Sequence, residues 1–440
     1  MPRYIAILFS ILLVISSTIP SYMGIELGTG PFLSASRIII IISLFCIMLV
    51  FASYIASHRK CKHSEHCIFV LPSNGVGWIL FVYTLSMLVS AIFSTKLSDS
   101  LLSLFSERYL FGIILLLLGF NIAQSSKSRE TLERSLIFAV TITIFISAID
   151  YILGHSLFST LDLPGRNEIK EGFFAVKERL GLIRVQSSMN NPVTYGTFLL
   201  MCFPLVIFYL RSSNNIISKV LLSIIGLMII LLAIMTIVRS VIFMLFIQVI
   251  ILRKVIGKNI KTIFYPIILF LLIGFVFVNH ELLSDIYDSL VLEGERTVEN
   301  STIYRRDMLE AGVSRFVESP IIGVGQNRFG REVEGEYLGK TIFFEHHENF
   351  FLTILVETGI LGFVAFGLVI LCALSILIRM KKSDSLNEQY LSQTYMAVIV
   401  GWAGMSLFLD SLSFSQISVV FWVLLGTVLG FGKQKKCIHV

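Results

Sequence analysis

The stretch that determines the fold reads Glu345-His346-His347-Glu348-Asn349, and an apolar run over residues 350–378 follows it directly. An apolar segment of about 20 residues is long enough to cross a bilayer as a helix. Upstream lie Arg305-Arg306 and the turn Ser319-Pro320-Ile321-Ile322-Gly323-Val324-Gly325. Because titratable groups gather here beside a membrane entry point, we expect the chemistry between residues 300 and 363.

The composition of the whole chain is that of a polytopic membrane protein. Of its 440 residues, 55% are hydrophobic and 15% are charged, whereas soluble domains carry about 25% charged residues. The apolar runs predict an all-α fold of about 12 transmembrane helices, since lipid offers backbone polar groups no other partner. The predicted spans are 4–20, 37–56, 75–94, 108–124, 134–153, 193–210, 217–236, 239–252, 262–280, 350–378, 391–409 and 413–431.

The distribution of basic residues predicts how these helices are oriented. Loops assigned to the cytoplasm carry clusters such as Arg253-Lys254 and Lys381-Lys382, whereas short loops on the other side carry few basic residues. Residues 217–252 are interpreted as two spans with Arg239 at their outer turn, because one span would move the Arg253 cluster outside. With an uncleaved first span, both termini are predicted to be cytoplasmic.

Two long segments are then external, at 154–191 and 281–349, while residues 1–440 form one integral membrane domain. Long loops are exempt from the charge bias and often carry function. The second loop is predicted to contain short helices, one beginning near 282 on the membrane face and one from Ser301 to Glu318. In the latter, Leu309, Val313 and Phe316 are expected to form the buried stripe.

Several other classes of partner are not expected. The net charge of +6 follows the membrane-orientation pattern, so it does not indicate nucleic acid. The run from His58 to Cys67 contains metal-type ligands, but no second ligand pair of matching spacing accompanies it. The sequence therefore predicts no metal site, no cofactor and no disulfide framework.

Arginines are the first candidate site residues. Arg239 lies between two apolar spans, where a guanidinium is costly unless it meets an anion or a water-filled cavity; the alternative is snorkelling to lipid phosphates. Arg305 and Arg306 open the predicted loop helix, where arginine suits phosphate recognition. The alternative for this pair is a surface salt bridge with Asp307 or Glu310.

The second set of candidates lies at the opening of the 350–378 helix. His346 and His347 are candidate acid/base residues because imidazole titrates near neutral pH; the alternative is two exposed loop histidines. Glu357 and Asp410 are unusual in lipid surroundings, and either could pair with one of the arginines named above.

The order of these motifs resembles the membrane domain of the O-antigen ligase and polymerase family. The resemblance rests on Thr236–Ser240, on Arg305 before a short helix, on the Pro-x-x-Gly-x-Gly turn, and on Asn349 opening a helix that reaches Glu357-Thr358-Gly359. It includes Arg184 before Asn191-Pro192, although that dipeptide alone is also a helix start. The strongest resemblance covers 184–200, 232–245 and 301–363.

The chain departs from the family pattern in three places. Val238 stands where the family usually has Ser, and Gly is frequent in the family near Ser187. Glu348, not His, directly precedes Asn349. The base is therefore His347, Glu348 or His346, with the choice left open.

The resemblance implies a GT-C-like bundle in the bacterial inner membrane and a metal-independent inverting glycosyltransferase. Its donor would be a glycan on undecaprenyl diphosphate at the periplasmic face, and its substrate-binding residues would be Arg239, Arg305, Arg306, Arg184 and Asn349. The acceptor would be the lipid A core for a ligase or another lipid-linked repeat for a polymerase. Rival hypotheses are a lipid-linked sugar flippase, which favours charges near the bilayer midplane, and a non-catalytic envelope scaffold.

Overall fold

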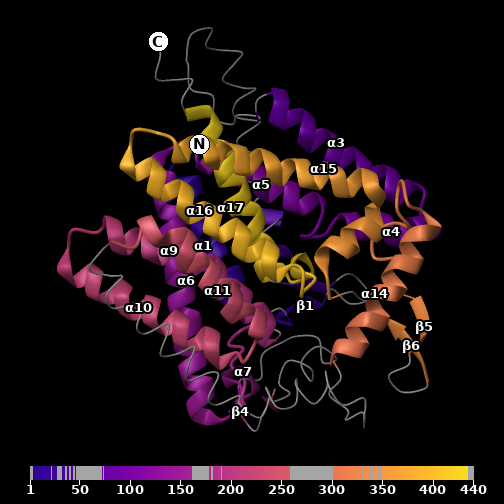
Figure 1. The fold of residues 1–440 in the computed structure, drawn as a ribbon, viewed down its shortest axis with the longest axis horizontal. Coiled ribbons are helices and arrows are strands. Elements are labelled where there is room, and N and C mark those ends of the chain that lie inside the picture. The colour runs from indigo at the N-terminus through magenta and orange to yellow at the C-terminus, as the bar shows by residue number, and fades with distance from the viewer. Residues whose placement is uncertain are drawn as a thin grey trace.

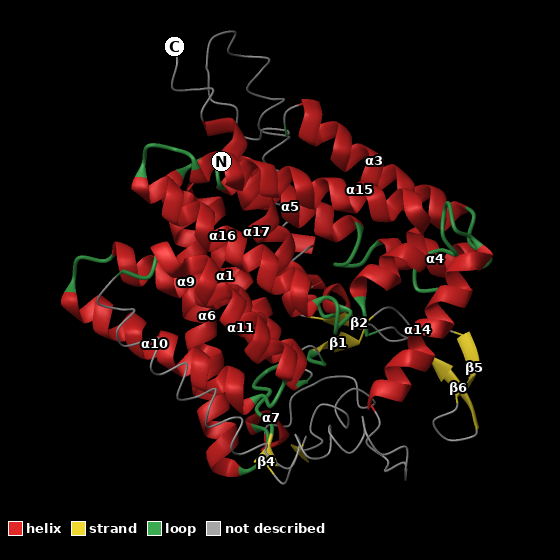
Figure 2. Cartoon of the chain, in the orientation of Figure 1, coloured by secondary structure: helices red, strands yellow, loops and turns green. Residues whose placement is uncertain are grey.

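The computed structural model describes residues 3–20, 22–26, 32–34, 37–38, 41–42, 45, 72, 74–160, 178–179, 182–189, 191–257, 301–329, 331–335, 340–344 and 348–434. Within these residues the chain is predominantly helical (Figures 1 and 2), and its strands form only two-stranded antiparallel hairpins. The predicted helical class is confirmed.

The described helices are α1 (Arg3–Thr18), α3 (Asn74–Ile92), α4 (Leu97–Leu104), α5 (Leu110–Ile122), α6 (Ser126–Leu153), α7 (Leu157–Thr160), α9 (Pro192–Ser212), α10 (Ile216–Met235), α11 (Arg239–Ile251), α14 (Ser301–Glu318), α15 (Phe350–Lys381), α16 (Leu386–Met405) and α17 (Ser415–Gln434), with short 3-10 turns η1 (Leu252–Lys254) and η2 (Ser411–Ser413). The hairpins pair β1 (Gly24–Glu26) with β2 (Phe32–Ser34), β3 (Glu178–Arg179) with β4 (Leu182–Ile183), and β5 (Arg331–Gly335) with β6 (Lys340–Phe344).

Six of the described helices, α3, α6, α9, α10, α15 and α17, are long and apolar enough to cross a membrane, and α1 and α5 are shorter apolar helices. Helices also lie at the predicted spans 239–252 and 391–409. The predicted spans 37–56 and 262–280 fall largely or wholly outside the described residues. The total of about 12 spans therefore stays a prediction.

The helices pack in pairs that are distant in sequence. α5 lies along α17, α1 along α6, α3 along α15 and α9 along α16 (Figure 1). Gly119 and Gly426 allow α5 and α17 to approach closely. A Cβ at either position would collide with a carbonyl of the other helix. Small residues allow such close contact where lipid supplies no hydrophobic drive for association.

An aromatic cluster fixes the first turn of α15 against the bundle. The Phe350 ring lies 5.6 Å from Trp402 of α16 and 5.3 Å from Phe366, measured between centroids. Trp402 in turn stacks on Phe421 of α17 at 3.7 Å. Burial of such rings is a large apolar contribution, so the residues just before Phe350 are held at a defined place.

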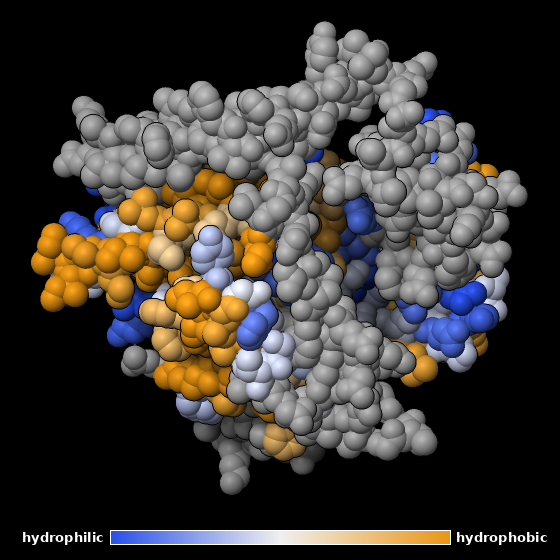
Figure 3. Space-filling model, turned by 90° about the horizontal axis from the view of Figure 1, so that it is seen from below, coloured by the Kyte–Doolittle hydropathy of each residue, from blue (hydrophilic) through white to orange (hydrophobic). Residues whose placement is uncertain are grey.

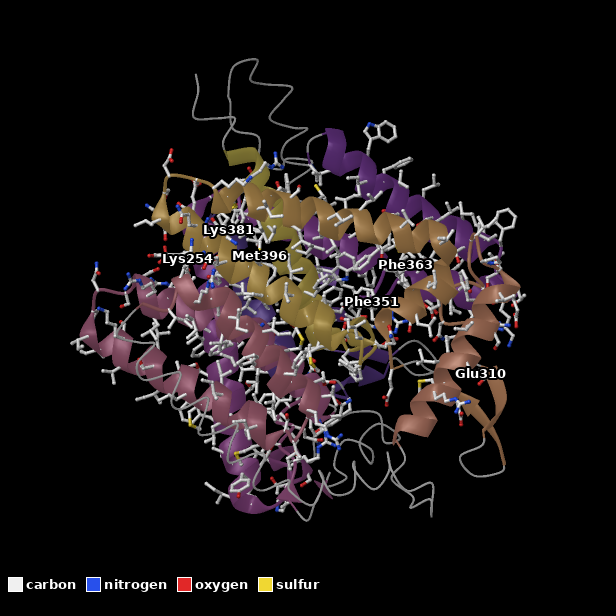
Figure 4. The ribbon with its side chains drawn as sticks, in the orientation of Figure 1. Lys254, Glu310, Phe351, Phe363, Lys381 and Met396 are labelled. Atoms are coloured by element: carbon white, nitrogen blue, oxygen red, sulfur yellow. The ribbon has the colours of Figure 1, made fainter. Side chains whose placement is uncertain are left out.

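The predicted break inside 217–252 is confirmed. α10 ends at Met235 and α11 begins at Arg239, and Ile237 between them has a positive φ of 52°. That conformation is strained for a β-branched residue, so the helix cannot continue through it. Lys254 after α11 and Lys381 at the end of α15 lie toward the same end of the molecule, away from Glu310 (Figure 4), as the two-span interpretation requires.

The prediction of which face of α14 is buried is wrong. Leu309 and Val313 are exposed and Phe316 is only partly buried, whereas Met308 and Ala311 are buried. The reason is that α14 packs on the first turns of α15, where Met308 and Ala311 meet Val356. The helix boundaries were predicted well, since α14 runs from Ser301 to Glu318 and ends at Ser319-Pro320.

Much of the exposed surface of the bundle is apolar. On α10 alone Ile216, Ile217, Val220, Leu221 and Ile224 are exposed. In Figure 3 orange, apolar surface gathers at the end of the molecule that α10 occupies in Figure 1. A soluble monomer rarely shows contiguous apolar surface of this kind, which agrees with helices that face lipid.

Candidate functional site

Arg239 occupies the first position of α11 and is exposed. Val238 precedes it at the N-cap, and no side-chain oxygen caps this end of the helix. The first N–H groups of a helix and its dipole favour an anion, whereas a cation at this position is unfavourable by itself. Among the residues that the structure describes, no carboxylate forms an ion pair with Arg239. The turn is therefore suited to an anionic ligand.

Arg184 lies at the same turn, although it comes from the segment before α9. Its Nε donates to the main-chain oxygen of Thr236 at 2.9 Å. One residue later, the N–H of Val185 donates to the oxygen of Met235 at 3.2 Å. The structure thus brings two predicted site arginines, Arg184 and Arg239, to the two sides of the α10–α11 turn.

The segment that carries Arg184 is held at one end of the bundle. The Ser187 hydroxyl donates to Thr143 of α6 at 2.9 Å. Gln416, in the first turn of α17, donates through Nε2 to the oxygens of Ser188 and Ile19, both at 3.0 Å. Asn191 accepts from the N–H of Thr194 at 2.8 Å and so caps α9.

The opening of α15 lies at the same end. The N–H of Phe350 donates to Ser406 after α16 at 3.0 Å, and the Ser406 hydroxyl lies 2.7 Å from that of Ser411, just before α17. Since Gln416 of α17 also holds the Arg184 segment, the arginine turn and the α15 opening are joined through the first residues of α17.

Asn349 and Glu348 form that opening. The Asn349 side chain accepts from the N–H of Leu352 at 3.1 Å and is therefore the N-cap of α15. Glu348 is exposed, and its N–H lies 3.2 Å from Sδ of Met308 on α14. Of the three candidate bases, Glu348 is described, whereas His346 and His347 lie outside the described residues.

The Gly-x-Gly turn joins α14 to a break inside α15. Gly359 has φ 65° and ψ −171°, so the helix is interrupted there. The N–H groups of Ile360 and Leu361 donate to Pro320 and Ile321 at 2.9 and 3.3 Å. Val324 and Gly325 donate back to the oxygens of Val356 and Glu357 at 3.0 and 3.2 Å. The turn therefore satisfies the backbone groups that the break releases.

Only glycine fits at the contact between these two segments. Gly323 has φ 79°, and a Cβ there would collide with the Glu357 oxygen. A Cβ on Gly359 would collide with the Ile321 oxygen. Both residues are thus needed for conformation and for close approach. Gly323 and Gly359 therefore allow the turn after α14 to form backbone hydrogen bonds with α15.

A buried charge cluster lies next to the contact between the Gly-x-Gly turn and α15. Arg108, between α4 and α5, contacts Glu357 Oε2 through Nη1 at 3.2 Å and Asp410 Oδ2 through Nη2 at 2.5 Å. Glu357 also accepts from the Tyr109 hydroxyl, and from the Asn327 N–H at 2.9 Å. Burial opposes the charge of Arg108, but Asp410 and Glu357 raise the pKa of its guanidinium above the ordinary value.

The family model described as O-antigen ligase matches residues 194–367. Residues 194–367 belong to the O-antigen ligase family. No curated protein matches the chain. The O-antigen ligase domain includes α9, α10, α11, α14 and the opening and break of α15, and with the apolar helices it indicates an integral membrane protein.

The O-antigen ligase domain contains most of the predicted site residues, and the structure describes some of their side chains. Arg239, Arg306, Glu348 and Asn349 are described within it, and Arg306 is exposed on α14. The backbone of Arg305 lies in α14, whereas its side chain lies outside the description. Arg184 precedes the matched residues, but it contacts them through Thr236.

The arginine that pairs with Glu357 and Asp410 is Arg108, which was not among the candidate site arginines. The signal was present, because Arg108 is one of few basic residues in the short loops assigned to the outer side. Arg108 and Asp410 both lie outside the matched O-antigen ligase residues. Within the part of the chain that the structure describes, no group of three His, Cys, Asp or Glu side chains could hold a metal ion.

Proposed function

We propose that this protein is a glycosyltransferase of the bacterial inner membrane that uses a glycan on undecaprenyl diphosphate. It transfers the glycan to a hydroxyl of the lipid A core at the periplasmic face, with both termini in the cytoplasm. The observation that carries the proposal is that Arg184 bonds to Thr236 at the end of α10, three residues before Arg239 begins the uncapped helix α11 inside the O-antigen ligase domain.

The two arginines suit the leaving group. When the diphosphate leaves the sugar, negative charge develops on the oxygen that had joined the two. Guanidinium groups already held in place stabilise that charge. Arg184 is positioned by its bond to Thr236, and Arg239 by the strained turn at Ile237. Arg305 and Arg306 on α14 are proposed to contact the remaining phosphate oxygens.

The opening of α15 suits the acceptor. The acceptor hydroxyl attacks the anomeric carbon as the bond to diphosphate breaks, and a base takes the hydroxyl proton. His347, Glu348 or His346 is that base, and the reaction inverts the anomeric centre without a metal. Asn349, which caps α15, is proposed to orient the acceptor through its amide.

The break in α15 bears on the flippase hypothesis. Transporters leave the carbonyls of a broken helix free to bind an ion near the midplane. Here the Pro320–Gly325 backbone fills the bonding positions around Gly359, and the adjacent carboxylates are paired with Arg108. This favours an enzyme. A repeat-unit polymerase remains the alternative within the family, since its donor chemistry is the same.

The test is glycan transfer in cells and in proteoliposomes. Arg239→Ala and Arg184→Ala should each lower transfer from a lipid-linked donor by about 10²- to 10³-fold, and Arg239→Lys should restore part of it. Arg253→Ala is the matched control, because Arg253 is exposed just past the other end of α11. Normal glycan in both alanine variants would exclude the proposed enzyme.

A deletion strain separates the two acceptors. Full-length glycan retained on the lipid carrier means that a ligase has been lost, whereas single repeats on the core mean that a polymerase has been lost. A gel of cell-surface polysaccharide distinguishes these outcomes.

A further inference from the structure

Helix α14 has an exposed apolar stripe on the face turned away from α15. Leu309, Val313 and Val317 are spaced four residues apart, which places them on one side of the helix. Their exposed fractions are 45%, 54% and 67%, and Ile321, after the helix, is 61% exposed. An external helix that faced only water would not place its apolar residues in this register.

The stripe continues directly into the lipid-facing surface of α15. The oxygen of Ile321 accepts from the N–H of Leu361 at 3.3 Å, so these two residues are neighbours. From there Ile360, Leu361, Val364, Leu368 and Leu371 are exposed along α15. The apolar surface thus passes without interruption from a transmembrane helix onto α14.

The length of α15 places this junction at the outer edge of the hydrocarbon. α15 has 32 residues, and about 20 suffice to cross a bilayer core of about 30 Å. Counting about 20 residues back from Arg379 at its basic end reaches Ile360, next to the break at Gly359. The first turns of α15 therefore project above the hydrocarbon, and Ile321 lies at the boundary.

We infer that α14 lies on the outer surface of the bilayer, with Leu309, Val313, Val317 and Ile321 buried among lipid headgroups and the upper acyl chains. Exposed Arg306, one turn before Leu309, lies at the polar end of this stripe, where guanidinium groups meet phosphates. The occupant is the lipid surface, because the stripe is continuous with surface that already faces lipid. α14 is thus an interfacial helix of the kind that binds membranes through one apolar face.

The orientation of α14 agrees with this placement. Met308 and Ala311 pack toward Val356 of α15, so the apolar stripe cannot turn inward to the protein. In Figure 1 α14 lies at the same end of the molecule as the start of α15 and runs across it rather than along it. A helix that crosses the end of the bundle lies in the plane of the membrane surface.

The experiment places an environment-sensitive fluorophore on single cysteines at 313, 317 and 318 in nanodiscs. Val313→Cys and Val317→Cys report on the stripe, and Glu318→Cys is the matched control one residue further round the helix. The six native cysteines are replaced first, and folding of that background is checked by gel filtration. Quenching is then compared between a nitroxide lipid labelled near the headgroup and aqueous iodide.

The expected result is several-fold stronger quenching by the nitroxide lipid than by iodide at positions 313 and 317, with the reverse at 318. Iodide quenching at 313 and 317 equal to that at 318 would show that the stripe faces water. Protection from both quenchers would show that protein covers it. Either outcome overturns the inference. The readout needs no glycan transfer, so it also works in an Arg239→Ala background and is separate from the proposed enzyme activity.

Discussion

Arg108 and Glu357 form a buried ion pair that connects the loop before α5 to the part of α15 just before its break, with 3.2 Å between Nη1 and Oε2. Glu357 has a relative side-chain exposure of 2%, and Asp410 shares the same guanidinium. Three parts of the chain that are remote in sequence therefore depend on one cation.

Arg108→Ala should be strongly destabilising. It leaves the Glu357 and Asp410 carboxylates without their common cation, and breaking a buried pair from one side costs about 3–5 kcal/mol. Thermal unfolding in detergent measures the loss. Arg134→Ala is the control, because Arg134 forms an exposed pair with Glu130 at 2.6 Å that is worth only about 0.5 kcal/mol. Equal losses in the two variants would contradict a structural role for the cluster.

Gly323→Ala and Gly359→Ala should each separate α14 from α15. Each methyl group would collide with a main-chain oxygen at a residue of positive φ, and such conformations cost about 1–2 kcal/mol before the collision is counted. Gly367→Ala is the matched control in the same helix, because a Cβ there meets nothing within 4 Å. It should stabilise α15 by up to about 1 kcal/mol. Unfolding midpoints of the three variants test this.

Substitutions of Asn349 separate its capping role from a role in catalysis. Asn349→Ala removes the acceptor for the Leu352 N–H and should cost about 1 kcal/mol of stability. Asn349→Asp keeps the acceptor and should retain stability, since a negative charge is favourable at a helix start. Loss of glycan transfer in a stable Asn349→Asp protein would assign a function to the amide group. Normal transfer would leave only the cap.

The two arginines at the α10–α11 turn should not act independently. If Arg184 and Arg239 bind one diphosphate, the double alanine variant should lose less transfer activity than the product of the two single losses. Residues that share a partner show interaction energies of about 0.5–3 kcal/mol. A double-mutant cycle on transfer rate gives the value. If the free-energy losses of the two single variants add up to that of the double variant, the two side chains bind separate ligands.

The sequence predicted the helices well because their signals are local. Long apolar runs give the spans, and the α10–α11 break followed from the position of Arg253 and the later basic loops. The end of α14 at Ser319-Pro320 was likewise predicted from a helix-stopping pair. The spans and the end of α14 depend on residues that are close together in the chain, whereas the break depends also on the charge pattern of the later loops.

Long-range partners and facing directions could not be predicted in the same way. Arg108 and Asp410 are 302 positions apart, and nothing local to either one indicates the other. The stripe of α14 was placed on the wrong face because apolar periodicity does not distinguish a side that meets protein from a side that meets lipid. The sequence showed the Gly-x-Gly turn, but its partner, the break at Gly359, was not predicted.

The hydrogen bonds between Pro320–Gly325 and Val356–Leu361 have a mechanical consequence. Because the turn replaces the connectivity missing at Gly359, any tilt of the upper part of α15 has to carry α14 with it. The backbones of Arg306 and Asn349 should then keep a constant separation. If the proposed glycan donor binds here, its sugar chain would have to enter by motion of other segments and not by separation of α14 from α15.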